Sequence, residues 1–298
     1  NEPAVIAVLG HTIGEMAPGH RDAQEGLSAA HHLLLAHGLA VRAFRDTSGR
    51  KQTAGANASQ PVSGIGIALS INHQEPATDD ERDVAAAKRM DGLWNRLYLD
   101  PLFRGHYPED ILAWLDQAGI LPDAIAKPQP EEMQMISQET DFLGINYYTR
   151  NQVAWDPADR LLNASAITPR LPVTAMGWEV YPEGLFKVLK RVSDDYTRIP
   201  LFITENGAAF DDSLPPDGSI VDDSARVAYL SSHLDAAHRV CECGINLRGY
   251  YVWSLMDNFE WAQGYSKRFG LVHVDFQTQR RTPKRSALWY RDFITSQR

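Results

Sequence analysis

The sequence predicts an α/β fold built on a parallel sheet. Short apolar runs, typical of strands, alternate with longer helical segments along the 298 residues. The strand runs are almost continuously apolar, as expected when helices cover the sheet. Polar and aromatic residues gather where these runs end. An eight-stranded (β/α) barrel, or any open α/β sheet, places its site at those ends.

The first half of the chain shows three helices and one strand. Residues 26–45 have helix-forming composition and apolar residues at helical spacing. Residues 63–71 alternate with period two and predict a strand. The helix predicted over 79–102 begins with acidic residues, which helix N-termini favour. The helix predicted over 108–119 has a proline near its start and a glycine at its end.

The βα alternation continues through the middle of the chain. Residues 140–149 predict a strand and 181–196 a helix. The apolar, β-branched run over 199–207 predicts a strand that ends in a turn. A helix over 222–244 ends at Gly244.

The chain closes with an aromatic-rich strand over 246–258, a short hairpin arm over 269–276 and a helix over 282–296. We therefore expect four core strands, near residues 65, 144, 203 and 251. The polar segment 45–64 is expected to be flexible or disordered, and 211–223 to be a loop with turn signals. The alternation crosses both, so neither marks a domain boundary.

Composition excludes several classes of protein. The chain is 44% hydrophobic, with a formal net charge of -9, which disfavours nucleic acid as a partner. No apolar run approaches the roughly 18 residues of a membrane span, and we expect no membrane association. No signal-peptide pattern is seen, which favours a cytoplasmic location. Cys241 and Cys243 cannot frame a disulfide scaffold or complete a zinc site.

Two glutamates stand beside asparagines in the strings "NEP" at 1–3 and "ITENG" at 203–207. Glu205 ends a strand, where a substrate can reach its carboxylate. Glycoside hydrolysis needs one carboxyl as proton donor and a second as nucleophile or base. Glu2 and Glu205 are far apart in sequence, but a barrel brings distant strand ends to one mouth.

Aromatic residues favour the same chemistry. Trp178, Trp253, Trp261, Tyr148 and Phe269 are expected in loops or at strand ends. Aromatic rings suit the flat C–H faces of sugars, and the polar neighbours of Trp253 and Trp261 favour a pocket wall over a core position.

Metal and nucleotide sites find little support in the sequence. His31 and His32 lack a matching carboxylate pattern, and "GIG" at 64–66 lacks the remaining glycine of a dinucleotide fingerprint. Cleavage by two carboxyls needs no cofactor and no metal.

Six strings in order, "NEP", "FLGINYYT", "MGWEVYPEGL", "LFITENGAAFDD", "LRGYYVWSLMDNFEWAQGYSKRFGLVHVDF" and "RTPKRSALWYRDFI", resemble glycoside hydrolase family 1, the β-glucosidase family. The resemblance implies a (β/α)8 TIM barrel. The chain covers roughly its C-terminal half, from the end of strand 4 to helix 8. Residues 1–298 would then be part of one barrel domain. The family's substrate is a β-glucoside or oligosaccharide.

The resemblance also implies roles for individual residues. Glu2 resembles the general acid/base, and Glu205 the nucleophile that forms the glycosyl-enzyme. Asn1 resembles the amide that binds the sugar 2-hydroxyl. Tyr148 resembles the phenol that hydrogen-bonds the nucleophile, and Asn146 shares its pocket. The family mechanism is retaining, with carboxyls about 5–5.5 Å apart and their pKa values separated by their environments.

The remaining roles concern recognition. Trp253 resembles the platform under the glycone, Glu260 and Trp261 the ligands of its far hydroxyls, and Trp178 and Phe269 the lining of the aglycone entrance. The Glu260 carboxylate would repel a sugar phosphate, which favours unphosphorylated β-glucosides. Glutamate rather than glutamine at position 2 disfavours thioglucosidase chemistry.

The resemblance leaves the first half of the barrel unmatched, including a glutamine and a histidine that bind sugar hydroxyls in the family. A half barrel has open sheet edges and an uncovered interior. We expect it to need its missing N-terminal half as a partner. The alternative is an inactive or weakly sugar-binding fragment. A free ammonium group at Asn1 is expected to lower the pKa of Glu2, the wrong direction for a proton donor.

Overall fold

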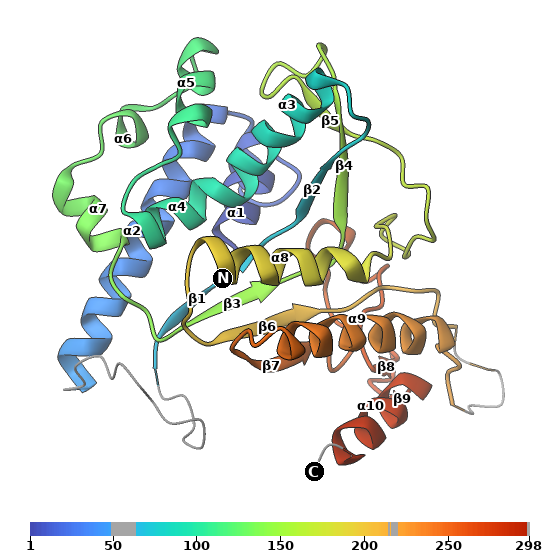
Figure 1. The fold of residues 1–298 in the computed structure, drawn as a ribbon. Helices are drawn as coiled ribbons and strands as arrows, with labels where there is room; N and C mark the ends of the chain where they lie inside the picture. Colours follow the sequence, from blue (N-terminus) through green and yellow to red (C-terminus); the bar gives the residue numbers. More distant parts are fainter. Residues whose placement is uncertain (49–63, 214, 216–219, 297–298) are drawn as a thin grey trace.

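A four-stranded parallel sheet forms the centre of the molecule (Figure 1). This computed structural model describes residues 1–48, 64–213, 215 and 220–296. The sheet contains, in spatial order, β1 (Gly66–Ser70), β3 (Phe142–Asn146), β6 (Leu201–Asn206) and β7 (Leu247–Val252). Each is a predicted strand, shortened at both ends. Spatial order follows sequence order, as in successive βα units.

Helices connect these strands as predicted. They are α2 (Ala23–Ser48), α3 (Glu81–Asp91), α4 (Leu97–Arg104), α5 (Glu109–Gln117), α8 (Pro182–Asp195), α9 (Ser224–Glu242) and α10 (Arg285–Ser296). The single helix predicted over 79–102 is divided by a π-helical segment, η2 (Gly92–Arg96). The Asp80 side chain caps α3 by accepting from the Arg82 N–H at 2.8 Å.

The helix α2 runs to Ser48, so the first residues of the expected loop 45–64 are helical. The rest of that loop, 49–63, lies outside the described residues, so its predicted flexibility stays a prediction. The predicted loop 211–223 is described only in part.

A second, small sheet was missed by the sequence analysis. It contains β2 (His73–Pro76), β4 (Arg150–Trp155) and β5 (Ala164–Ala166). Two short helices, α6 (Asp123–Ala126) and α7 (Pro130–Ile136), were also missed. These elements are only three to seven residues long, too short for an apolar periodicity to mark them.

Shorter elements surround the strand ends. The chain begins with α1 (Pro3–Val5) and a π-helix, η1 (Ile6–Thr12). The 3₁₀ turn η3 (Trp261–Gln263) follows β7. The predicted arm over 269–276 contains β8 (Val272–Val274), which pairs with β9 (Arg281–Pro283).

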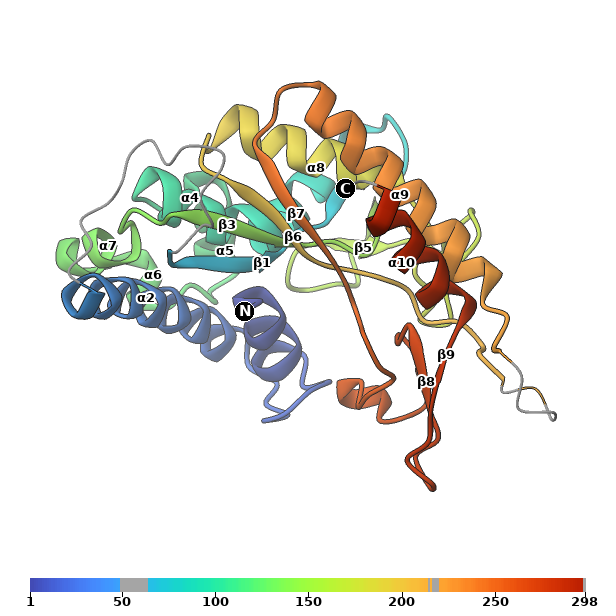
Figure 2. The same ribbon diagram turned by 90° about the horizontal axis from the view of Figure 1, so that it is seen from below.

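One hydrophobic core joins the sheet to its helices. Leu143, Ile145 and Ile203 in the strands are fully buried, together with Leu185 and Leu189 of α8. The helices α8 and α9 lie side by side over the same face of the sheet (Figure 2). In the described parts of the chain, no helix is long and apolar enough to cross a membrane.

Both edges of the sheet are open in the part of the chain that the structure describes. Within the described residues, no strand pairs with the outer edge of β7, and the outer edge of β1 receives only the Glu2 N–H. Large apolar side chains are exposed in β7 and the segment after it: Tyr251, Leu255, Met256, Phe259, Trp261 and Tyr265. This surface agrees with the open edges expected of half a barrel.

Candidate active site

The candidate site lies at the C-terminal ends of the four parallel strands. Glu205 is the fifth residue of β6 and is in register with Asn146, the last residue of β3. An irregularity in the ladder between Ile145 and Asn146 lets both side chains reach this end of the sheet.

Two donors hold the Glu205 carboxylate. The Tyr148 hydroxyl donates to Oε2 at 2.6 Å, and the Asn1 amide donates to Oε1 at 3.4 Å. Burial raises the pKa of the Tyr148 phenol well above its usual value, and the negative charge of Glu205 raises it further. The phenol therefore stays protonated and acts as the donor to the Glu205 carboxylate.

Glu2 is attached to β1 through its main chain. Its N–H donates to the Ala68 carbonyl at 2.9 Å, and its φ of 48° lies in the left-handed region. Such a conformation is costly for a side chain larger than glycine and occurs most often at functional sites. The position of Glu2 is therefore fixed by the sheet edge as well as by its side chain.

The environment of Glu2 favours the protonated acid. Burial and then the charge of Glu205 raise the pKa of Glu2 from 4.5 to about 7. A hydrogen bond from Asn146 and the ammonium group of Asn1 act in the opposite direction. The ammonium thus lowers the pKa of Glu2 as expected, but burial and the charge of Glu205 raise it by more.

Asn146 connects the two sides of the site. Its Nδ2 donates to Glu2 Oε1 at 3.0 Å and to Asn1 Oδ1 at 3.2 Å. The side-chain oxygen Oδ1 of Asn146 accepts from the Thr204 hydroxyl at 2.5 Å, which orients the side-chain amide. Asn146 is fully buried, so these contacts are shielded from competing water.

The segment after β7 brings a third carboxyl. Burial raises the pKa of Glu260, a hydrogen bond from the Trp253 side chain lowers it, and the charge of Glu205 raises it. Trp253 and Glu260 are therefore neighbours near Glu205. Trp261 is 54% exposed and has a φ of 39°. Half of its surface is thus free in this chain.

Three aromatic rings form one wall beside Glu205. Tyr148 lies 5.3 Å from Trp178 and 6.2 Å from Phe269 between ring centroids, and Trp178 lies 6.2 Å from Phe269. Phe269 is only 2% exposed. It supports the other two rings from behind, and Trp178 offers the more accessible surface.

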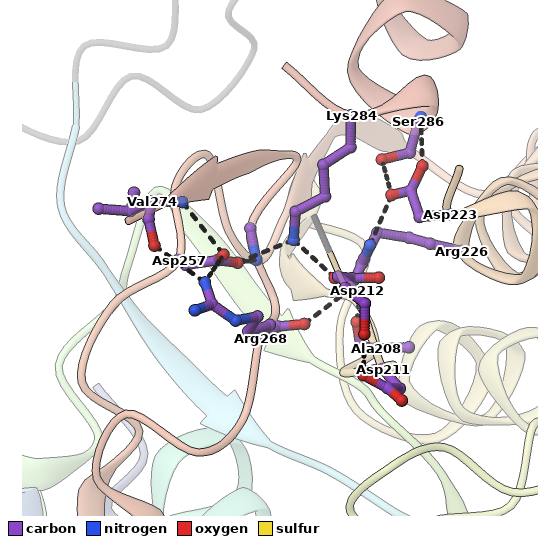
Figure 3. Close-up of polar contacts among 12 residues, drawn as sticks. Ala208, Asp211, Asp212, Asp223, Arg226, Asp257, Arg268, Val274, Lys284 and Ser286 are labelled. Carbon is purple, nitrogen blue, oxygen red and sulfur yellow. Dashed lines mark hydrogen bonds and ion pairs between the residues drawn. The ribbon is translucent and has the colours of Figure 1, made fainter. Parts of the chain in front are cut away.

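A buried charge network supports the segment that carries Glu260 (Figure 3). Lys284 Nζ donates to Asp257 Oδ1 at 2.8 Å and to Asp212 Oδ2 at 2.6 Å. Arg226 joins Asp212 to Asp223 at 2.6 and 2.5 Å. These five side chains are at most 1% exposed. The network connects the loops after β6 and β7 with the starts of α9 and α10.

Known proteins resemble this chain along its whole length. The sequence model of glycosyl hydrolase family 1 matches residues 1–298. The chain belongs to glycosyl hydrolase family 1.

Relatives in the family are named as β-glucosidases. "Beta-glucosidase A" of Thermotoga maritima is 42% identical over 99% of this chain, and "Beta-glucosidase A" of Acetivibrio thermocellus is 40% identical over 99%. A crystal structure of a β-glucosidase from Exiguobacterium marinum superposes with a TM-score of 0.90 at 38% identity. These likenesses confirm the expected fold class, a (β/α)8 barrel represented by its C-terminal portion.

The chain spans only part of its relatives. It covers 62% of the length of the Thermotoga and Acetivibrio proteins, and 100% of this chain aligns with 64% of the Exiguobacterium structure. The share is larger than the half predicted from the sequence, and the matched part is the C-terminal portion of these relatives, as predicted.

Hydrogen bonds join Asn1, Glu2, Asn146, Tyr148 and Glu205 in the structure, and their roles stay predictions. The residues that support them were not predicted from the sequence. Thr204 and the Asp257 network were not identified, nor was the role of Asn206, whose amide donates to the Tyr147 carbonyl at 2.7 Å and to the Tyr229 hydroxyl at 3.0 Å. Among the described residues, the groups that could hold a metal ion do not include Glu2, Glu205 or Glu260.

Proposed function

We propose that this chain supplies both catalytic carboxyls of a retaining β-glycosidase that hydrolyses terminal, unphosphorylated β-D-glucosides. The observation that carries the proposal is the contrast between two neighbouring carboxyls. Glu2 has its pKa raised to about 7, whereas Glu205 accepts hydrogen bonds from Tyr148 and Asn1. One proton donor and one ionised nucleophile are what double displacement requires.

In the first step, a Glu205 oxygen attacks the anomeric carbon while the glycosidic C–O bond breaks. Glu2 gives its proton to the leaving oxygen. The glycosyl ester removes the negative charge of Glu205, so the pKa of Glu2 falls. In the second step, Glu2 takes a proton from water, the water oxygen attacks the anomeric carbon, and Glu205 leaves as carboxylate.

The remaining residues bind the sugar in this proposal. Asn1 binds the 2-hydroxyl, where contacts strengthen in the transition state. Trp253 lies under the glycone ring. The Glu260 carboxylate accepts hydrogen bonds from the glycone hydroxyls farthest from the anomeric carbon, and the Trp261 N–H donates to them. Trp178 lines the aglycone side. A carboxylate at Glu260 repels phosphate, which supports an unphosphorylated glycone.

We further propose that residues 1–298 are one part of a single barrel domain and that turnover requires the N-terminal part that the relatives contain. The open edges of β1 and β7 and the exposed apolar surface after β7 support this. The same surface also supports the second candidate function, an inactive or weakly sugar-binding fragment.

An activity assay with a chromogenic β-glucoside distinguishes the two candidate functions. The chain is assayed alone and after mixing with a separately produced N-terminal barrel part from a family 1 relative. We expect turnover only in the mixture, and Glu205→Gln should reduce it by about 10⁴-fold or more. Ordinary turnover by the lone chain would contradict the need for a partner. Unchanged turnover in Glu205→Gln would contradict the mechanism, and no turnover under any condition would favour the fragment.

A further inference from the structure

Three side chains that belong to no part of the candidate active site converge on one point beside α2. Glu25 Oε1 accepts from His11 Nδ1 at 2.7 Å, and His20 Nδ1 contacts the same oxygen. The ligand atoms of these three residues all lie within 4.8 Å of one another. They come from the end of η1, the loop after it and the first turn of α2.

Backbone hydrogen bonds hold the three residues independently of their side chains. The His20 N–H donates to the Gly10 carbonyl at 3.0 Å, and the Asp22 N–H donates to the His11 carbonyl at 2.8 Å. Asp22 Oδ1 in turn accepts from the Glu25 N–H at 3.0 Å, which caps the start of α2. The loop is thus folded back so that both imidazoles face the helix.

We propose that His11, His20 and Glu25 bind a divalent transition-metal ion of the zinc type. Two imidazole nitrogens and one carboxylate oxygen are ligands that zinc prefers, with water in the fourth position. The side chains of His20 and Glu25 are 52% and 42% exposed, so an ion and its water can reach them. Tetrahedral bonds of about 2.05 Å place ligand atoms about 3.3 Å apart. His11 and Glu25 therefore need to separate by about 0.6 Å, and His20 and Glu25, whose contact is shorter, by somewhat more; rotations of these side chains supply both movements.

The bound ion joins the helical segment that follows Glu2 to the start of α2. It replaces hydrogen bonds between partly exposed groups with metal–ligand bonds. Because binding requires the folded arrangement of three separate elements, it stabilises the folded chain by an amount that grows with the logarithm of the metal concentration above the dissociation constant.

The test uses the full chain in a Cys241→Ser, Cys243→Ser background, because both thiols are exposed and compete for zinc. Zn²⁺ is titrated by calorimetry, and Co²⁺ is followed by its visible absorption. We expect one ion per chain, a tetrahedral Co²⁺ spectrum and a thermal midpoint that rises with Zn²⁺. Glu25→Gln and His20→Ala should each weaken binding at least tenfold and remove the rise in midpoint.

His238→Ala is the matched control. His238 also lies near a glutamate, with Nε2 3.5 Å from Glu242 Oε1 on the exposed side of α9, but no third ligand joins them among the described residues. Binding should be unchanged in this variant. Equal affinity in Glu25→Gln and the parent, or no binding by the parent at millimolar Zn²⁺, would overturn the proposal. Glu25→Gln keeps the side-chain shape, so it remains informative if His20→Ala fails to fold.

Discussion

Replacing Lys284 by methionine should destabilise the chain far more than replacing its neighbour Arg285. Lys284 is fully buried and donates to Asp212 and Asp257. Methionine has a similar volume but no charge, so the two carboxylates lose their shared cation. Removing one partner of a buried ion pair costs about 3–5 kcal/mol, a large share of the roughly 5–15 kcal/mol of a typical domain.

Arg285 provides the comparison within the same segment. Its guanidinium lies 3.3 Å from Asp222, and both side chains are more than half exposed. Such a surface pair contributes about 0–1 kcal/mol. We therefore expect Arg285→Met to leave the free energy of unfolding almost unchanged.

The measurement is urea unfolding followed by tryptophan fluorescence, with the slope m compared between variants. The wild type is stabilised by an ionised Asp257. Burial alone would raise the pKa of Asp257, but Lys284 and Arg268 hold it below 3.8. This contribution is present above the unfolded pKa and is lost as pH falls through the lower folded pKa. The difference in free energy of unfolding between the wild type and Lys284→Met should therefore decrease below about pH 4.

Two outcomes would refute this reasoning. One is a loss below about 1 kcal/mol in Lys284→Met. The other is an equal loss in Lys284→Met and Arg285→Met. If Lys284→Met does not fold at all, Lys284→Arg keeps the charge and should recover part of the stability.

Three further predictions concern the carboxyls. Tyr148→Phe removes the hydroxyl that donates to Glu205 at 2.6 Å. A hydrogen bond to a charged group is worth about 1.5–3 kcal/mol, so kcat/KM of the complemented enzyme should fall about 10- to 150-fold. An unchanged kcat/KM would exclude the role of the phenol. Glu205→Gln should lower the pKa of Glu2 from about 7. This pKa is measured by ¹³C NMR of the labelled Glu2 carboxyl. An unchanged pKa would mean that the two carboxyls do not interact. The pKa of Glu2 in the folded chain lies above its ordinary 4.5. The free energy of unfolding of the wild type should therefore fall by about 3 kcal/mol between pH 4.5 and 7 relative to that of Glu2→Gln, as measured by urea unfolding at several pH values. A difference between the two free energies that does not change with pH would contradict the raised pKa.

The sheet was predictable because buried strands carry a strong local signal. The apolar runs around Ile145 and Ile203 mark β3 and β6 without any knowledge of tertiary structure. The small sheet of β2, β4 and β5 was not predictable in this way. His73–Pro76 is polar and only partly buried, and it becomes a strand because β4 lies beside it.

The carboxyls of the site were predictable from residue type and position, but their environments were not. Which of Glu2 and Glu205 is protonated depends on burial, and burial depends on segments far away in the sequence. Lys284 and Asp257 are 27 residues apart, and nothing in either local sequence indicates that they pair. The convergence of His11, His20 and Glu25 depends on a loop that folds back, which no periodicity reveals.

Because the main-chain hydrogen bond to Ala68 fixes Glu2 at the edge of the sheet, the curvature of the sheet affects the distance between Glu2 and Glu205. Glu2 borders β1, and Glu205 lies on β6, with β3 between them. Three lateral steps of about 4.8 Å amount to roughly 14 Å along the arc. A retaining pair needs carboxyls about 5–5.5 Å apart. Curvature of the strands and the reach of the two side chains together have to make up this difference above Asn146. A packing change on the helix-covered face can then alter the proposed catalysis by flattening that curvature.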